Sequence, residues 1–261
     1  MSGARGLRSL AGSADLPPGA LVDRTVLGGR SEPLLWRADA PAGPGDWGRM
    51  LRVARSAGLW PVLLGRNGRG TSPEDDLLPE PVPAGVGAAG TLARWWEEHA
   101  AREPDGTALR PYGGRWPGLA PPPGGAVGDP GAAAEAVARS LVSSGTLRDP
   151  RIALVPARRG ADVPAAIGWT GTLASGEGPA PFGAVLRSWE ERFGARVVAL
   201  EPDVLHLSVA APPRTAREAL AVAAEHFAFC PAVVRQGPGS LARYAEKWLL
   251  PGRGHWSFWW D

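Results

Sequence analysis

The stretch His255-Trp256-Ser257-Phe258-Trp259-Trp260-Asp261 ends the chain and constrains its fold more than any other. Three tryptophans and one phenylalanine lie within these seven residues. Burying aromatic rings of this size makes some of the largest single contributions to a hydrophobic core. We therefore expect the C-terminus to be an integral strand of the fold, and we expect the domain to unfold if this tail is removed.

The composition is that of an ordinary globular protein. The chain has 261 residues, 44% of them hydrophobic and 21% charged, which suits one large domain or two small ones. Lys247 is the single lysine, and the formal net charge is only +2. No run of arginines alternates with aromatic residues as a nucleic-acid groove requires, so we predict no nucleic-acid partner. We interpret the densest basic pair, Arg158-Arg159, as part of a solvated loop.

The cysteine content and the hydropathy pattern indicate a cytoplasmic protein. Cys230 is the single cysteine and excludes an internal disulfide, so nothing in the sequence requires an oxidising compartment. Residues 7–21 are broken by Ser, Gly, Asp and Pro, unlike the apolar core of a signal peptide. No stretch approaches the roughly 20 apolar residues of a membrane span, so we predict no membrane contact.

Turn-forming residues divide the chain into four parts. We expect residues 1–30 to be a flexible lead and residues 31–120 to be an N-terminal α/β region. Residues 121–130 are rich in Pro and Gly and form the predicted linker. Residues 131–261 form the predicted C-terminal α+β domain.

The N-terminal region has the pattern of a small strand–helix–strand unit. Apolar residues 34–36 and 61–64 predict the two strands. Between them, Asp46 is expected to cap a helix that stops at Gly58. Further on, Thr91 is expected to cap another helix.

The C-terminal half contains clearer strand patterns. Residues 152–155 form a continuous apolar run, which is typical of a strand buried on both faces. Residues 196–200 and 204–209 flank the turn Glu201-Pro202-Asp203 and predict a hairpin. The aromatic tail supplies a fourth strand.

Helix patterns lie between these strands. Apolar residues recur at helical spacing from Phe182 to Phe193, and Thr215 with Glu218 forms a capping box that opens a helix over 216–229. A shorter helix follows Ser240. The resulting order predicts an α+β fold. Its C-terminal half is expected to form an antiparallel four-stranded sheet in split βαβ (ferredoxin-like) order. The smaller strand–helix–strand unit precedes this sheet in the chain.

Several short motifs occur together in the C-terminal part. They are Ala153-Leu154-Val155-Pro156, Gly168-Trp169, Val185-Leu186-Arg187-Ser188-Trp189-Glu190-Glu191-Arg192-Phe193-Gly194-Ala195, Ala224-Glu225-His226-Phe227-Ala228-Phe229-Cys230-Pro231, Gln236-Gly237 and Trp256-Ser257-Phe258-Trp259-Trp260-Asp261.

This combination resembles bacterial proteins that carry the domain of unknown function 4253, over about residues 151–261. The resemblance implies no established activity. The chain departs from the family pattern at Ala232, where an acidic residue is expected after Cys-Pro, and in residues 170–181, which lack the expected Asn and Asp. We therefore expect this chain to lack any chemistry that those polar groups perform in relatives.

His226 and Cys230 are the first candidates for chemistry. They are four residues apart on one predicted helix and so share a face. Joined by His206 or His255, they could hold zinc, or Cys230 could act as a nucleophile. The simpler alternative is a buried apolar cysteine next to proline. The negative end of the helix dipole also disfavours a thiolate at this position, and we predict no bound metal or other cofactor.

Glu190 and the Gly168-Trp169 pair are the remaining candidates. Glu190 and Glu191 are adjacent and point about 100° apart on a helix, so we favour a solvated face over an acid–base pair. Trp169 lies between glycines and either anchors a partner or fills the core under a loop. Trp189 and Trp248 are predicted to be core residues.

The sequence lacks the motifs of the common nucleotide-binding and hydrolytic sites, including Gly-x4-Gly-Lys, Gly-x-Ser-x-Gly and HExxH. The leading hypothesis is a non-enzymatic binding module that engages a protein partner through loops and sheet edges. The alternative is a small hydrolase-like or metal-dependent enzyme that uses His206, His226, Cys230 and Glu190.

Overall fold

The computed structural model describes Leu7 and residues 16–23, 32–79, 85–103, 106–124, 128–172, 178–250 and 252–260. Most of the predicted flexible lead lies outside the described residues, as do residues 125–127 of the predicted linker and Asp261 of the tail. Within residues 1–30, the structure places Leu7 in the core and forms a strand from Gly19 to Val22. The predicted domain boundaries stay a prediction.

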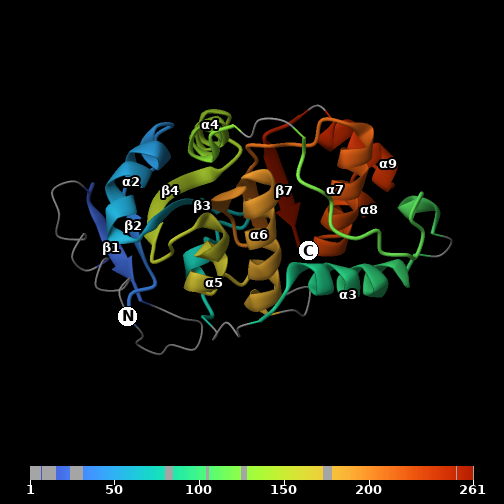
Figure 1. The fold of residues 1–261 in the computed structure, drawn as a ribbon. Helices are drawn as coiled ribbons and strands as arrows, with labels where there is room; N and C mark the ends of the chain where they lie inside the picture. Colours follow the sequence, from blue (N-terminus) through green and yellow to red (C-terminus); the bar gives the residue numbers. More distant parts are fainter. Residues whose placement is uncertain are drawn as a thin grey trace.

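The described strands form a single mixed sheet (Figure 1). Its order is β1-β2-β4-β3-β5-β6-β7, and neighbours are antiparallel except for the parallel pair β3–β5. The strands are β1 (Gly19–Val22), β2 (Leu35–Ala38), β3 (Trp60–Arg66), β4 (Arg148–Val155), β5 (Arg196–Leu200), β6 (Val204–Ser208) and β7 (His255–Trp259).

The predicted four-stranded ferredoxin-like sheet is wrong. That order requires the tail strand to pair with residues 148–155, whereas β7 pairs with β6 at the edge of a seven-stranded sheet. Strand β3, from the N-terminal region, inserts between β4 and β5 and pairs with both. Its residues from Pro61 to Gly65 are buried, so β3 is a central strand of the common sheet.

Helices cover both faces of the sheet, so the fold has three layers (Figure 1). Helices α2 (Asp46–Ala54) and α4 (Pro130–Ser143) pack on one face. Helices α3 (Ala88–Ala100), α5 (Val163–Ile167), α6 (Pro179–Phe193) and α7 (Ala216–Phe229) pack on the other. Helices α8 (Ala232–Arg235) and α9 (Leu241–Tyr244) continue this second layer at the β7 end. None of the described helices is both long enough and apolar enough to cross a membrane.

The predicted helix ends are confirmed at Gly194 of α6 and Thr215 of α7, and the predicted caps of α2 and α3 are wrong. Thr215 and Glu218 make the predicted reciprocal capping box of α7, and Gly194 ends α6 in the left-handed conformation. Helix α2 is capped by Gly45 instead of Asp46, whose carboxylate reaches back to the Gly43 N–H at 2.8 Å. Helix α3 starts after Gly87, so Thr91 lies inside it, because the alanines at 88 and 89 extend the helix towards the N-terminus.

The prediction that Trp248 is a core residue is wrong, since its relative exposure is 48%. Residues Ala245–Leu249 form a π-helix, marked by the hydrogen bond from Leu250 N to Ala245 O at 2.8 Å. This i→i+5 pattern shifts the buried position by one residue. Leu249 therefore takes the core place that α-helical spacing assigns to Trp248.

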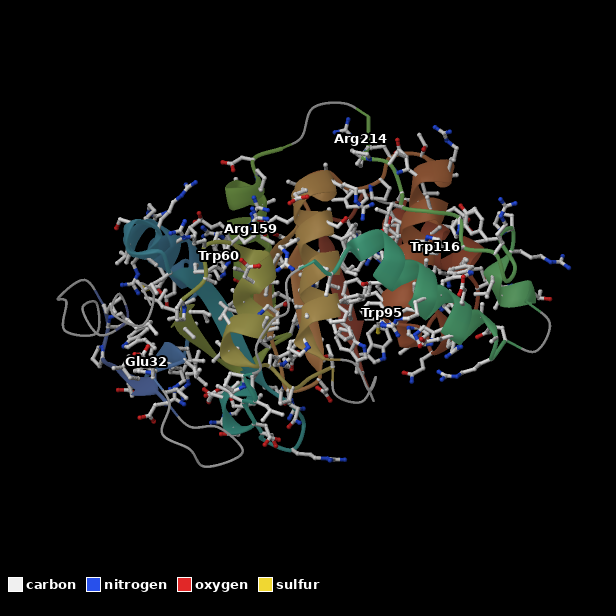
Figure 2. All side chains as sticks on the ribbon, turned by 60° about the horizontal axis from the view of Figure 1, so that its bottom comes forward. Glu32, Trp60, Trp95, Trp116, Arg159 and Arg214 are labelled. Atoms are coloured by element: carbon white, nitrogen blue, oxygen red, sulfur yellow. The ribbon has the colours of Figure 1, made fainter. Side chains whose placement is uncertain are left out.

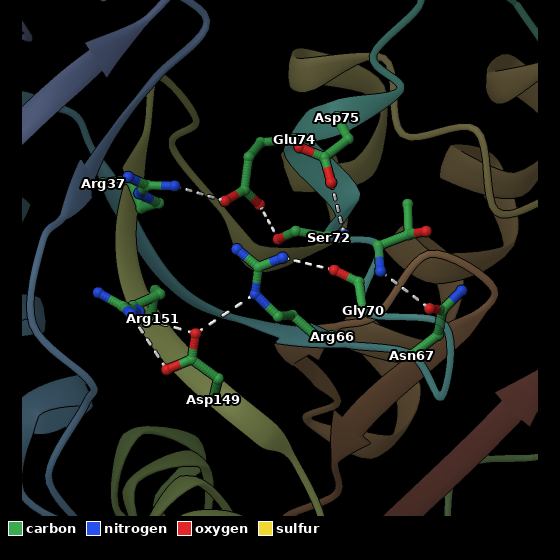
Figure 3. Close-up of polar contacts among 10 residues, drawn as sticks. Arg37, Arg66, Asn67, Gly70, Ser72, Glu74, Asp75, Asp149 and Arg151 are labelled. Carbon is green, nitrogen blue, oxygen red and sulfur yellow. Dashed lines mark hydrogen bonds and ion pairs between the residues drawn. The ribbon is translucent and has the colours of Figure 1, made fainter.

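A polar network fastens the loop that follows β3 to the sheet (Figure 3). Glu74 is largely buried, pairs with Arg37 of β2 at 2.9 Å and accepts the Ser72 hydroxyl. Close by, the Asp149 carboxylate accepts hydrogen bonds from the guanidinium groups of Arg66 and Arg151. Glu74 and Asp149 are each matched by an arginine, and Asp75 accepts the Ser72 N–H at 2.8 Å, so we interpret this network as structural.

Candidate functional site

The outward edge of β7 carries unused backbone hydrogen-bonding groups. The bonds from Val209 N to Gly254 O and from Trp260 N to Asp203 O show that the even-numbered residues of the tail pair with the β6 side. In an antiparallel ladder the alternate residues turn their N–H and C=O the other way. His255 and Ser257 therefore direct both groups away from the sheet, and within the described part of the chain no hydrogen bond reaches them.

A groove of about 300 Å³ runs beside this edge. Both faces of β7 contribute to it, through Trp256 on one side and Ser257 on the other, so the groove opens at the strand edge itself. Its remaining wall is mainly apolar and comes from α8, α9 and the π-helix, with Val233, Tyr244, Trp248 and Leu249 among the lining residues.

The two ends of the groove differ. At one end, the Trp259 carbonyl accepts the Cys230 thiol at 3.0 Å, and the Trp259 indole N–H donates to Gln236 at 2.9 Å. At the other end, the Arg253 guanidinium lies 5.1 Å from the centre of the exposed Trp248 ring. No ion pair joins Arg253 to a described acidic residue, so this end presents a positive charge.

A chain of polar side chains lies on the sheet face beside the groove. His206 of β6 contacts Glu201 at 3.1 Å through Nε2 and His255 Nε2 at 3.2 Å through Nδ1. Burial, with the neighbouring His206, lowers the pKa of His255 to about 4, so this ring is neutral at pH 7. The structure thus brings together two of the predicted histidines, with His206 in the middle between His255 and Glu201.

His226 and Cys230 lie elsewhere, on the buried side of α7. His226 is enclosed by aromatic rings, contacts the Tyr244 hydroxyl at 3.0 Å, and its Nε2 has no partner among the described residues. Burial lowers the pKa of His226 to about 3, with a smaller effect from Arg192. Cys230 is fully buried at the end of α7.

Glu190 and Trp169 occupy two further places. Glu190 accepts the Ala161 N–H at 3.1 Å and pairs with Arg196 at 3.3 Å. Burial raises the pKa of Glu190 against the opposing effect of these neighbours. Trp169 is 5% exposed and its indole N–H donates to the Glu201 carbonyl at 2.8 Å, which favours the core interpretation of this residue over the partner anchor.

Gly168, the neighbour of Trp169, has a structural reason to be glycine. Its φ of +67° is unfavourable for other residues, and a Cβ there would lie 2.1 Å from the Pro79 nitrogen. The Gly168-Trp169 pair thus joins the loop 77–79 to the core, since Leu78 N also donates to the Gly168 carbonyl at 2.7 Å.

The four residues of the enzyme hypothesis do not share one site. His206 contacts Glu201 and His255, His226 contacts Tyr244, and Cys230 contacts Trp259, while Glu190 is held by Ala161 and Arg196. Across the described ranges, no group of three or more His, Cys, Asp and Glu side chains is placed to hold a metal ion. Sequence reasoning missed the groove at β7, because the edge position of the tail and the π-helix that exposes Trp248 are both decided by the fold and not by a sequence motif.

The comparisons with known proteins agree with the family resemblance. A family model described as a domain of unknown function, DUF4253, matches residues 151–261. Comparisons with curated proteins and with solved structures gave no match. The matched segment holds β5, β6, β7 and most of β4 but not β3, so the strand that joins β4 to β5 comes from outside it.

Proposed function

We propose that the protein is a non-enzymatic interaction module that binds an extended peptide segment of a protein partner by strand addition to β7. The observation that carries this proposal is the outward edge of β7, where the backbone groups of His255 and Ser257 face an apolar groove. Strand addition at a sheet edge is a common mode of peptide recognition, in which backbone bonds provide affinity and side-chain pockets provide specificity. A bacterial origin and a cytoplasmic location remain part of the proposal.

The groove defines the chemistry of the peptide. Apolar side chains at alternate positions would contact Val233, Tyr244 and Leu249. A carboxylate near one end of the peptide would form an ion pair with Arg253. The neutral His255 ring lets the edge be covered without burying a charge on this strand.

The exposed Trp248 supports a binding role for this surface. Trp248 and Leu119 are the two large hydrophobic side chains that stand out as exposed in the described part of the chain, at 48% and 37%. Trp248 lines the groove and Leu119 does not. Tryptophan is enriched among the residues that dominate binding energy at protein interfaces.

The test is a selection of short random peptides on the immobilised full-length chain, followed by affinity measurements on one enriched peptide. We expect enriched sequences to alternate apolar and polar residues and to carry an acidic group. Ser257→Pro removes the outward N–H of β7 together with the hydroxyl, at an edge position where proline is tolerated because the N–H has no partner in the sheet, and it should weaken binding at least roughly tenfold. Ser257→Ala keeps the N–H and should bind as the wild type does.

A second pair of variants distinguishes binding in the groove from non-specific hydrophobic binding. Trp248→Ala should weaken the peptide, whereas Leu119→Ala should not. All variants are first checked for unchanged thermal melting. Equal binding by Ser257→Pro and Ser257→Ala, or the absence of any enriched peptide, would rule out strand addition at β7.

A further inference from the structure

An arginine-lined cleft of about 720 Å³ lies away from β7. It lies where β4 ends and where β3 and β5 begin. The side chains that define this arginine cleft are Arg55, Arg158, Arg159, Arg196, Trp60 and Glu190. Figure 2 shows Trp60 and Arg159 side by side at this place.

The arginines reach the cleft from distant parts of the chain. Arg55 follows α2, Arg158 and Arg159 follow β4, and Arg196 begins β5. Their charges are partly balanced by Glu190, which lies 3.3 Å from Arg196 and 3.8 Å from Arg159. Glu191 also pairs with Arg159, at 3.4 Å. Glu190 thus holds two guanidinium groups within reach of one another.

The other two arginines are not balanced in this way. Arg55 and Arg158 are exposed, and no ion pair joins either of them to a described acidic residue. The second acidic residue at the cleft, Asp129, caps α4 by accepting the Gly131 N–H at 2.8 Å. Asp129 keeps its charge as a cap, so the four arginines face three carboxylates, Glu190, Asp129 and Glu191, and the cleft has a small excess of positive charge.

We propose that the arginine cleft binds a small molecule that carries a diphosphate group. Guanidinium groups bind phosphate oxygens through paired hydrogen bonds, and two unbalanced arginines beside an ion-paired couple suit a ligand with more than one phosphate. The cavity volume lies in the range of small-molecule sites. This inference is independent of peptide binding, because the cleft adjoins β3, β4 and β5 and the groove adjoins β7.

The test uses inorganic pyrophosphate and ADP as probes, titrated calorimetrically into the full-length chain at constant ionic strength. We expect saturable binding that sodium sulfate at the same ionic strength does not reproduce. Arg55→Gln and Arg158→Gln should each weaken binding about tenfold or more. The affinity of Arg158→Lys should lie between those of Arg158→Gln and the wild type, because lysine keeps the charge but lacks the planar guanidinium that donates paired hydrogen bonds. Arg139→Gln is the control, since Arg139 is an exposed arginine of α4 that does not line the cleft.

The outcomes separate clearly. Tighter binding of ADP than of pyrophosphate would extend the proposal to a nucleotide, and equal binding would restrict it to the diphosphate. The proposal is overturned if neither probe saturates, if sulfate competes equally well, or if Arg139→Gln weakens binding as much as Arg158→Gln does.

Discussion

Removal of the Glu225 side chain from α7 should strongly destabilise the fold. Its carboxylate is fully buried and accepts four hydrogen bonds. Arg192 of α6 donates two of them at 2.7 Å each, the Trp189 indole donates one at 2.7 Å, and the Ala120 N–H donates one at 2.6 Å. One carboxylate thus joins α6, α7 and the segment before α4.

The expected cost of Glu225→Ala follows from what it leaves behind. The Arg192 side chain, 13% exposed, would lose its counter-charge, and the Trp189 and Ala120 N–H groups would be buried without acceptors. Breaking a buried ion pair from one side typically costs 3–5 kcal/mol. We expect a loss of about 4 kcal/mol in the free energy of unfolding, which corresponds to roughly 10 °C in Tm for a chain of this size.

The assay is urea unfolding followed by tryptophan fluorescence, with Glu98→Ala as the matched control. Glu98 pairs with Arg94 on the surface, where both side chains are nearly half exposed, so its loss should cost only about 0.5 kcal/mol. The double variant Arg192→Met, Glu225→Leu should recover part of the loss, because no buried charge remains. A Glu225→Ala variant as stable as Glu98→Ala would refute the reasoning, since it would mean that solvent reaches the carboxylate site.

Two further predictions concern protonation and backbone geometry. The pKa of His226 is lowered from 6.5 to about 3 by burial, so below pH 6.5 the unfolded chain takes up a proton that the folded chain refuses. The free energy of unfolding should therefore fall as the pH drops from 6.5 towards 3, by about 2 kcal/mol from His226 alone at pH 5. The check compares the shift of the urea midpoint between pH 7 and pH 5 in the wild type and in His226→Gln. Equal shifts in the two proteins would contradict this prediction. Gly168→Ala places a Cβ 2.1 Å from the Pro79 nitrogen at a residue whose φ is +67°. The control is Gly58→Ala, where φ is +68° but the space around the added Cβ is open. Gly168→Ala should therefore lower Tm clearly more than Gly58→Ala does. Equal Tm losses in calorimetry would show that only the left-handed backbone matters.

The sequence predicted most of the local structure, because the signals involved are local. The capping box at Thr215, the left-handed Gly194 and the apolar run at 152–155 each depend on residues close together in the chain. The aromatic tail did form a strand, with Trp256 and Phe258 in the core. The prediction for Trp248 is wrong because it assumes α-helical spacing, whereas the chain forms a π-helix there.

Only the tertiary structure decided the strand order and the candidate sites. Strand pairing depends on contacts between distant segments, and the insertion of β3 between β4 and β5 joins residues more than 80 positions apart. The same holds for the arginine cleft, where Arg55, Arg158 and Arg196 gather only after folding. β7 is an edge strand because, among the described strands, it pairs with β6 alone. Periodicity and capping depend on local steric and hydrogen-bonding preferences, whereas sheet order and site assembly depend on which buried surfaces fit together over the whole chain.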